Sequence, residues 1–182
     1  MALTSTIYNF DIELSDVDRG VYETLAVRAA LHPSESAEYL VARLIAYCLE
    51  YEEGITFSKG GVSDPDQPPL WVGTLDGRIK TWIEIGLPDP ARLHQASKNA
   101  GRVVVYTHRD PATIIRQASG QRIHRASEIE IHALDRQFIA ELVPLLDRRT
   151  RFELSVTGRH LYLNLGAHSL NGAVTEHRLE TP

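Results

Sequence analysis

The sequence predicts a mixed α/β fold in a single domain that spans residues 1–182. Helix and strand patterns follow one another along residues 34–108 in the order αβββαβ. Strand patterns precede this segment, and a hairpin pattern follows it. A chain of 182 residues that is 43% hydrophobic and 24% charged matches an ordinary globular domain. We therefore expect a core over 34–108 around a mixed central sheet, with additional N-terminal strands and a C-terminal β-hairpin.

The first thirty residues are typical of two strands around a turn. Apolar side chains mark residues 7–14 and alternate along 25–31, and DVDRG at 16–20 supplies the turn. Pro33 and Ser34 then predict the start of a helix.

The helix expected over residues 34–52 has the clearest period in the chain. Its apolar side chains recur at helical spacing and form one stripe: Ala37, Leu40, Val41, Leu44, Ile45 and Cys48. At about 100° per residue, Glu52 falls within this stripe and Glu50 falls outside it. Gly54 is typical of a helix end. We therefore expect Glu52 on the inward face of the helix.

Three short strands are expected next, at residues 55–58, 70–74 and 79–86. A loop rich in Gly, Pro and Asp fills residues 59–69. The Asp-Gly pair at 76–77 is a strong hairpin signal, so the last two strands should be antiparallel neighbours.

The second half of the chain again alternates between helix and strand. Pro88 suits the first turn of a helix that runs to Asn99. Pro144 should bend or end the third of the later helices early. The expected elements are a helix at 88–99, a strand at 102–108, a helix at 111–119, a strand at 128–134, a helix at 135–147 and a hairpin around Thr157-Gly158-Arg159. The polar residues from Ala167 onward predict a loosely held tail.

Acidic residues occur where two of these strands should meet. Asp66, preceded by Pro65, stands before the strand at 70–74, and Glu84 lies within the strand at 79–86. Because the start of one hairpin strand lies near the end of the other, the two acids can approach at one sheet edge, and Glu52 could join them. Converging carboxylates repel one another unless a hard cation lies between them, and Mg²⁺ suits oxygen ligands.

Each of these residues also has a purely structural interpretation. Glu84 could pair with an arginine such as Arg102, because a buried carboxylate needs a partner. Asp66 could form an Asx turn in the Pro-rich loop. Glu52 and Lys98 could be solvated surface charges. The tryptophans, Trp71 and Trp82, are expected in the core rather than as base-stacking platforms.

The αβββαβ order, with Pro-Asp before the second strand and an acid in the third, resembles the PD-(D/E)xK nuclease-like fold. Nearly the whole chain also resembles the YaeQ family of small bacterial proteins, through the strings FSKGGVSDPDQPPLW, WIEIGLPD, ARLHQASKNA and RVVVYT. That family is assigned to a variant of the same fold and has no established biochemical activity. The resemblance implies a restriction-endonuclease-like core and a magnesium-dependent reaction on nucleic acid as an expectation.

The sequence departs from the nuclease motif at one position. The motif reads acid-x-lysine, but Glu84 is followed by Ile85 and Gly86. In those nucleases the lysine is thought to position or activate the attacking water. Some members supply it from the following helix, where Lys98 or the neutral Gln95 could act from one shared face. Lys80 is a poor substitute, since four strand residues put it ~13 Å from Glu84.

Two segments carry a local excess of basic side chains. Residues 112–126 contain no acid and include Arg116, Arg122, His124 and Arg125, and residues 148–151 read RRTR. Beside the carboxylates they could contact phosphates, and elsewhere they would be solvated basic faces. The net charge of −5 argues against a tight, non-specific DNA-coating protein.

Composition and the absence of known motifs exclude several functional classes. The single cysteine excludes an internal disulfide and a cysteine-based zinc site, and no HxxxH spacing occurs. No apolar run approaches 18 residues and no signal peptide begins the sequence, so we expect a cytoplasmic protein without membrane contact. No GxSxG, P-loop or GxGxxG motif occurs.

Three functions stay open from sequence. The first is a Mg²⁺-dependent phosphodiesterase that acts on nucleic acid through Asp66 and Glu84, with Glu52 assisting and Lys98 or Gln95 replacing the missing lysine. The second is a catalytically degenerate nuclease fold that binds nucleic acid or a protein partner without cutting. The third is a regulatory or assembly factor that works through protein contacts.

Overall fold

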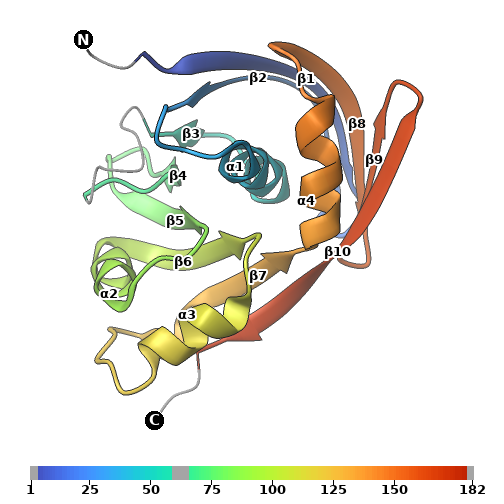
Figure 1. The fold of residues 1–182 in the computed structure, drawn as a ribbon. Helices are drawn as coiled ribbons and strands as arrows, with labels where there is room; N and C mark the ends of the chain where they lie inside the picture. Colours follow the sequence, from blue (N-terminus) through green and yellow to red (C-terminus); the bar gives the residue numbers. More distant parts are fainter. Residues whose placement is uncertain (1–3, 59–65, 180–182) are drawn as a thin grey trace.

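The computed structural model describes residues 4–58 and 66–179, so Pro65 and residues 59–64 of the expected loop lie outside the described residues. The strands of the described part are β1 (Thr6–Asp16), β2 (Val21–Leu31), β3 (Ile55–Phe57), β4 (Leu70–Gly73), β5 (Ile79–Ile85), β6 (Ala100–Thr107), β7 (Glu130–Leu134), β8 (Arg149–Thr157), β9 (His160–Leu165) and β10 (His168–Arg178). They form one sheet in the order β2-β1-β8-β9-β10-β7-β6-β5-β4-β3, which curves into a nearly barrel-shaped wall (Figure 1).

The sheet is mixed but mostly antiparallel. The parallel neighbours are β1–β8, β5–β6 and β6–β7, and the other neighbouring pairs are antiparallel. In the hairpin of β4 and β5, Leu70 lies opposite Ile83. This register puts the chain just before β4 beside the end of β5, as the sequence predicts.

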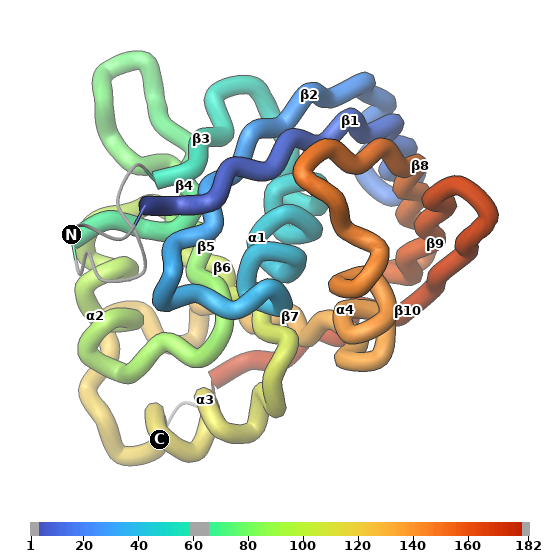
Figure 2. Tube along the Cα trace, turned by 45° about the horizontal axis from the view of Figure 1, so that its top comes forward, coloured from blue at the N-terminus to red at the C-terminus, as the bar shows by residue number. Residues whose placement is uncertain are grey.

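The structure describes four α-helices, which are α1 (Ala37–Leu49), α2 (Pro90–Asn99), α3 (Pro111–Ala118) and α4 (Arg136–Leu142). Figures 1 and 2 both show α1 inside the curve of the sheet, between β1–β2 and β5–β6. Every residue from Leu40 to Ala46 is buried, and α1 shares its core with apolar side chains of β1, β5, β8 and α4. A second core around Trp82, Leu93 and Ile114 joins α2 and α3 to β5, β6 and β7.

Side-chain caps explain where the helices begin. Ser36, not Ser34, accepts the amide hydrogen of Tyr39, so α1 begins at Ala37. Asp89 and Asp110 cap α2 and α3 in the same way, each just before a proline whose missing N–H costs nothing at that position.

The predicted element order of residues 34–108 is confirmed, since α1, β3, β4, β5, α2 and β6 follow one another. Pro144 ends α4 early, as expected, and lies in a 3₁₀ turn at Val143–Leu145. No helix of the described residues is long and apolar enough to cross a bilayer.

The prediction of a loosely held tail after Ala167 is wrong. Residues 168–178 form β10, which pairs with β9 through its first half and with β7 through its second half. Gly172 lies so close to α4 that a Cβ atom there would stand 2.8 Å from the Cβ atoms of Asp135 and Phe138. Backbone hydrogen bonds to two strands therefore hold a segment whose side chains are mostly polar.

Candidate active site

Helix α2 contacts both predicted carboxylates through one face. Gln95 Nε2 donates to Asp66 Oδ1 at 3.0 Å. Arg92 Nε donates to Glu84 Oε2 at 3.0 Å and to Oε1 at 3.2 Å. Residues three apart on a helix are surface neighbours, about 5–6 Å between Cβ atoms. The fold therefore brings each of the two acids into contact with α2, although Asp66 and Glu84 are 18 residues apart in the chain.

Glu84 is a buried carboxylate with two donors. Its side chain points from β5 toward α2, like that of Trp82 two residues before it. Trp82 Nε1 donates to Glu84 Oε2 at 2.7 Å, and only 5% of Glu84 is exposed. Burial raises the pKa of Glu84, while Arg92 and Trp82 oppose that rise. The structural interpretation of Glu84 as an arginine partner is confirmed, but the arginine is Arg92 rather than Arg102.

Arg92 is itself fixed from several sides. It donates through Nη2 to the carbonyl oxygen of Gln67 at 2.7 Å, and its guanidinium lies 5.4 Å from the centre of the Trp82 ring. Arg92 thus ties β5 to the chain that follows Asp66. Arg92 was not among the predicted site residues, although its place three residues before Gln95 on the predicted helix was a usable signal.

The two acids open into different hollows. Glu84 lines a cleft of about 650 Å³ together with Asp89, Arg92 and His108. Asp66 is exposed and lines a hollow of about 740 Å³, whose other charged residues are Arg78, Lys80 and Lys98. Gln95 lines that second hollow as well. Asp66, Gln95 and Lys98 therefore line one hollow, whereas Glu84 lines the other.

The prediction that Glu52 faces inward is wrong. Helix α1 ends at Leu49, so the helical period does not extend to Glu52. The Glu52 side chain is 42% exposed and forms an ion pair with Lys80 at 2.7 Å. Among residues 4–58 and 66–179, no three His, Cys, Asp or Glu side chains form a group that could hold a metal ion.

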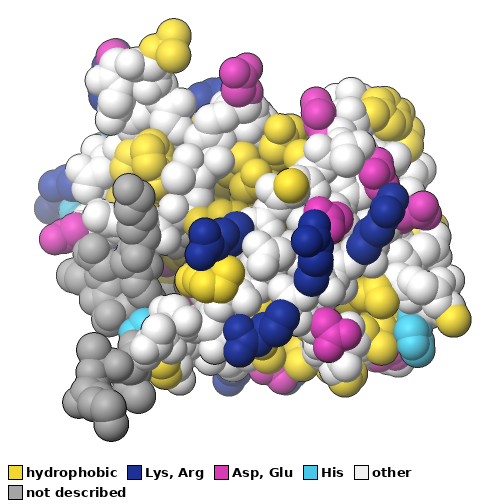
Figure 3. All heavy atoms as spheres, turned by 90° about the horizontal axis from the view of Figure 1, so that it is seen from above, with side chains coloured by type: hydrophobic (Ala, Val, Ile, Leu, Met, Phe, Trp, Pro, Cys, Tyr) yellow, Lys and Arg dark blue, Asp and Glu magenta, His cyan; other side chains and the backbone are white. Residues whose placement is uncertain are grey.

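Of the two basic segments, only the first borders this site. Arg122 and His124 line a hollow of about 380 Å³ with His94, Ile123 and Lys98. Arg149 instead pairs with Asp11 on β1. On the face seen from above, basic and acidic side chains are interspersed, which is typical of a solvated surface (Figure 3).

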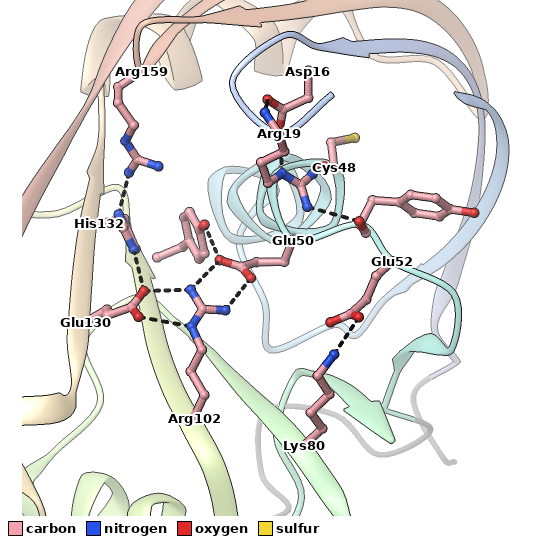
Figure 4. A network of polar contacts seen from close by, with 12 residues as sticks. Asp16, Arg19, Cys48, Glu50, Glu52, Lys80, Arg102, Glu130, His132 and Arg159 are labelled. Atoms are coloured by element: carbon pink, nitrogen blue, oxygen red, sulfur yellow. Dashed lines mark hydrogen bonds and ion pairs between the residues drawn. The ribbon is translucent and has the colours of Figure 1, made fainter. Parts of the chain in front are cut away.

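A polar network that sequence analysis did not predict lies where α1 ends (Figure 4). Arg102 Nη1 donates to Glu50 Oε2 at 2.6 Å, and its Nη2 donates to Glu130 Oε2 at 2.6 Å. Tyr106 donates its hydroxyl hydrogen to Glu50 at 2.6 Å. Glu50 thus turns inward, opposite to the prediction from the helical period. An arginine inside an apolar strand pattern was the one signal of this network.

His132 extends the network toward the β8–β9 turn. A guanidinium can only donate, so His132 Nδ1 accepts from Arg159, and Nε2–H donates to Glu130 at 3.2 Å. Burial lowers the pKa of His132. Burial acts to raise the pKa of Glu130, but hydrogen bonds from Arg102 and His132 outweigh it and lower the pKa to about 2.

These shifts predict that the free energy of unfolding decreases as the pH is lowered. Below the ordinary histidine pKa of 6.5, the unfolded chain takes up a proton at His132 that the folded protein resists. Glu130 adds a second loss as the pH falls from 4.5 toward 2. Urea unfolding at about pH 7.5 and about pH 5.5 measures the contribution of His132.

His132→Asn should reduce the difference in unfolding free energy between the two pH values. His168→Asn, at an exposed position, should leave that difference unchanged. Burial lowers the pKa of His108 as well, so the difference between the two variants is the informative quantity. An equal difference in unfolding free energy between the two pH values in both variants would contradict the assignment of a neutral, buried His132.

Comparisons with known proteins agree on one family. Residues 1–174 match the family model described as YaeQ protein. The chain is 28% identical over 176 residues to the Uncharacterized protein YaeQ of Escherichia coli (strain K12), which covers 96% of this chain and 97% of that protein. The crystal structure of YaeQ protein from Pseudomonas syringae matches with a TM-score of 0.86 and 28% identity over 97% of each chain. The crystal structure of YaeQ protein from Xanthomonas axonopodis pv. citri matches with a TM-score of 0.86 and 27% identity, over 97% of this chain and 100% of that one.

Proposed function

Because this chain belongs to the YaeQ family, we propose that its core is a variant of the PD-(D/E)xK nuclease-like fold and that it acts as a metal-dependent phosphodiesterase on nucleic acid. The order α1-β3-β4-β5-α2-β6 supports the fold assignment, as do the positions of Asp66 before β4 and Glu84 in β5. The contact of one face of α2 with both acids is the observation that carries the proposal.

Two carboxylates are a ligand set of the right chemical type and number for a divalent cation. Mg²⁺ in proteins is commonly held by one or two carboxylates and keeps several of its waters. Asp66 and Glu84, which line different hollows, would have to turn toward each other to hold it, and when bound it would polarise a phosphoryl oxygen as a Lewis acid. Arg92 now balances the charge of Glu84, so the cation has to compete with Arg92 for that carboxylate.

Gln95 and Lys98 orient the Asp66 carboxylate and supply positive charge beside it. Gln95 fixes the Asp66 carboxylate through its amide hydrogen bond. Lys98 lies one turn further along α2, lines the same hollow as Asp66, and can place its ammonium group beside a phosphate. Lys98 thereby takes the place of the lysine that the motif lacks after Glu84.

Calorimetry and cleavage test this proposal together. We expect wild type to give heat of Mg²⁺ or Mn²⁺ binding and to cleave single- or double-stranded substrate only with the ion present. Asp66→Ala and Glu84→Gln should each lose on the order of 100-fold or more of the rate, and Glu84→Gln should lose the metal heat. Glu153→Gln, an exposed acid on β8, is the control. Cleavage that survives Asp66→Ala would refute the proposal.

The Arg92–Glu84 pair also favours a second candidate, a catalytically degenerate fold that binds nucleic acid without cutting it. In that case Arg92 replaces the cation permanently. Salt-sensitive binding of nucleic acid that is unchanged by a chelator and by Glu84→Gln would identify this function. A protein partner recovered by pull-down, with no nucleic-acid binding, would instead point to an assembly factor.

A further inference from the structure

A hollow that no acid of residues 4–58 and 66–179 lines adjoins the proposed active site. Its lining residues are His94, Lys98, Arg122, Ile123 and His124, and its volume is about 380 Å³. Lys98 also lines the hollow that contains Asp66 and Gln95, so the two hollows lie on either side of this residue. We call the acid-free one the basic hollow.

The backbone that carries Arg122 and His124 is anchored on both sides. His124 donates its backbone hydrogen to His94 Nδ1 at 3.1 Å, and Ser97 Oγ donates to the carbonyl oxygen of His124. Arg125, in the left-handed conformation with φ 46°, donates to the carbonyl oxygens of Ser97 and Ala100, both at 2.7 Å. The basic hollow is therefore held in place before a ligand arrives, which reduces the entropy cost of binding.

The hydrogen-bond donors of the basic hollow are available. Because His94 Nδ1 accepts a backbone hydrogen, the neutral ring carries its proton on Nε2 and can donate it. Lys98 and Arg122 are exposed, and neither forms an ion pair with a residue of the described part of the chain. Donors from α2 and from the loop that follows α3, with no acid of the described residues between them, suit an anion with several acceptor oxygens.

We infer that the basic hollow binds a backbone phosphate of a nucleic-acid strand, next to the phosphate that reaches Asp66. This inference rests on the proposed function, because the shared Lys98 places the hollow along the path of a bound strand. Lys98 and Arg122 neutralise the phosphate, and the two histidines add hydrogen bonds. Such contacts fix the register of the strand and carry no base preference.

Binding of a fluorescein-labelled single-stranded 12-mer, measured by anisotropy without divalent ion, tests the inference. Arg122→Ala should weaken binding by about 5- to 10-fold and reduce the slope of log affinity against log salt by about one. Arg116→Ala is the matched control, since it removes the same charge from the same segment but lies on α3 outside the hollow. It should change affinity by less than about twofold.

Equal losses in the two variants, or no loss in either, would overturn the inference. So would displacement of the 12-mer by an equal phosphate-equivalent concentration of inorganic phosphate, because the site would then serve a small free anion. Both side chains are exposed, so an unchanged urea midpoint is expected to show that the variants fold. Failure of the phosphodiesterase proposal is distinguishable, because it removes cleavage and metal heat but leaves this metal-free binding intact.

Discussion

Replacing Arg92 with alanine is expected to lower the free energy of unfolding by about 3–5 kcal/mol, the usual loss when one partner of a buried ion pair is removed. The side chains of Arg92 and Glu84 are only 17% and 6% exposed, so water cannot take over the role of the guanidinium. The variant would leave Glu84 buried with Trp82 as its remaining hydrogen-bond donor of those described above.

Urea unfolding of a double-mutant cycle measures this effect. Glu84→Gln keeps the shape and removes the charge, so the Arg92→Ala/Glu84→Gln double variant should recover part of the loss. Arg78→Ala, whose pair with Asp76 is 82% and 51% exposed, should cost about 1 kcal/mol or less. A loss below about 1 kcal/mol in Arg92→Ala, or strict additivity in the cycle, would contradict the predicted coupling.

The same variant connects stability with the proposed metal site. If a divalent cation competes with Arg92 for Glu84, the Arg92→Ala variant should bind Mg²⁺ more tightly than wild type does. A concentration of 100 times the dissociation constant would then restore about 2.7 kcal/mol. A degenerate site that binds no metal would show no such recovery.

Arg102→Ala is the second large effect, with an expected loss of about 2–3 kcal/mol. One guanidinium serves both Glu50 and Glu130, so its removal leaves two carboxylates facing each other. The Arg102 side chain is 39% exposed, and solvent screening therefore keeps the loss below that of a fully buried pair.

Two further variants make the Arg102 prediction specific. Arg102→Lys should recover only part of the stability, because a single ammonium cannot form both forked contacts. Glu130→Gln in the Arg102→Ala background should recover more, since it removes the repulsion between the carboxylates. Arg149→Ala, from a pair 78% and 41% exposed, is the matched control and should lie within about 1 kcal/mol of wild type. A loss as small as that control would show that the network contributes little.

Local sequence signals were enough to predict the order of the elements and the edge of the sheet at which Asp66 lies. Helical and strand periods, the Asp-Gly turn and the prolines act over a few residues, and they were sufficient to predict α1 through β6 and the early end of α4. Hairpin geometry is local too, so the approach of Asp66 to the end of β5 followed from the same signals.

Which cation pairs with which acid depends on the three-dimensional fold. Arg102 contacts Glu50 and Glu130, 52 and 28 residues away, while Glu84 takes Arg92. The polar tail became β10 because β7 and β9 offered it backbone partners. Side-chain charge is visible in a sequence, but pairing depends on the register of distant strands and on where a helix stops, as the inward Glu50 and the exposed Glu52 show.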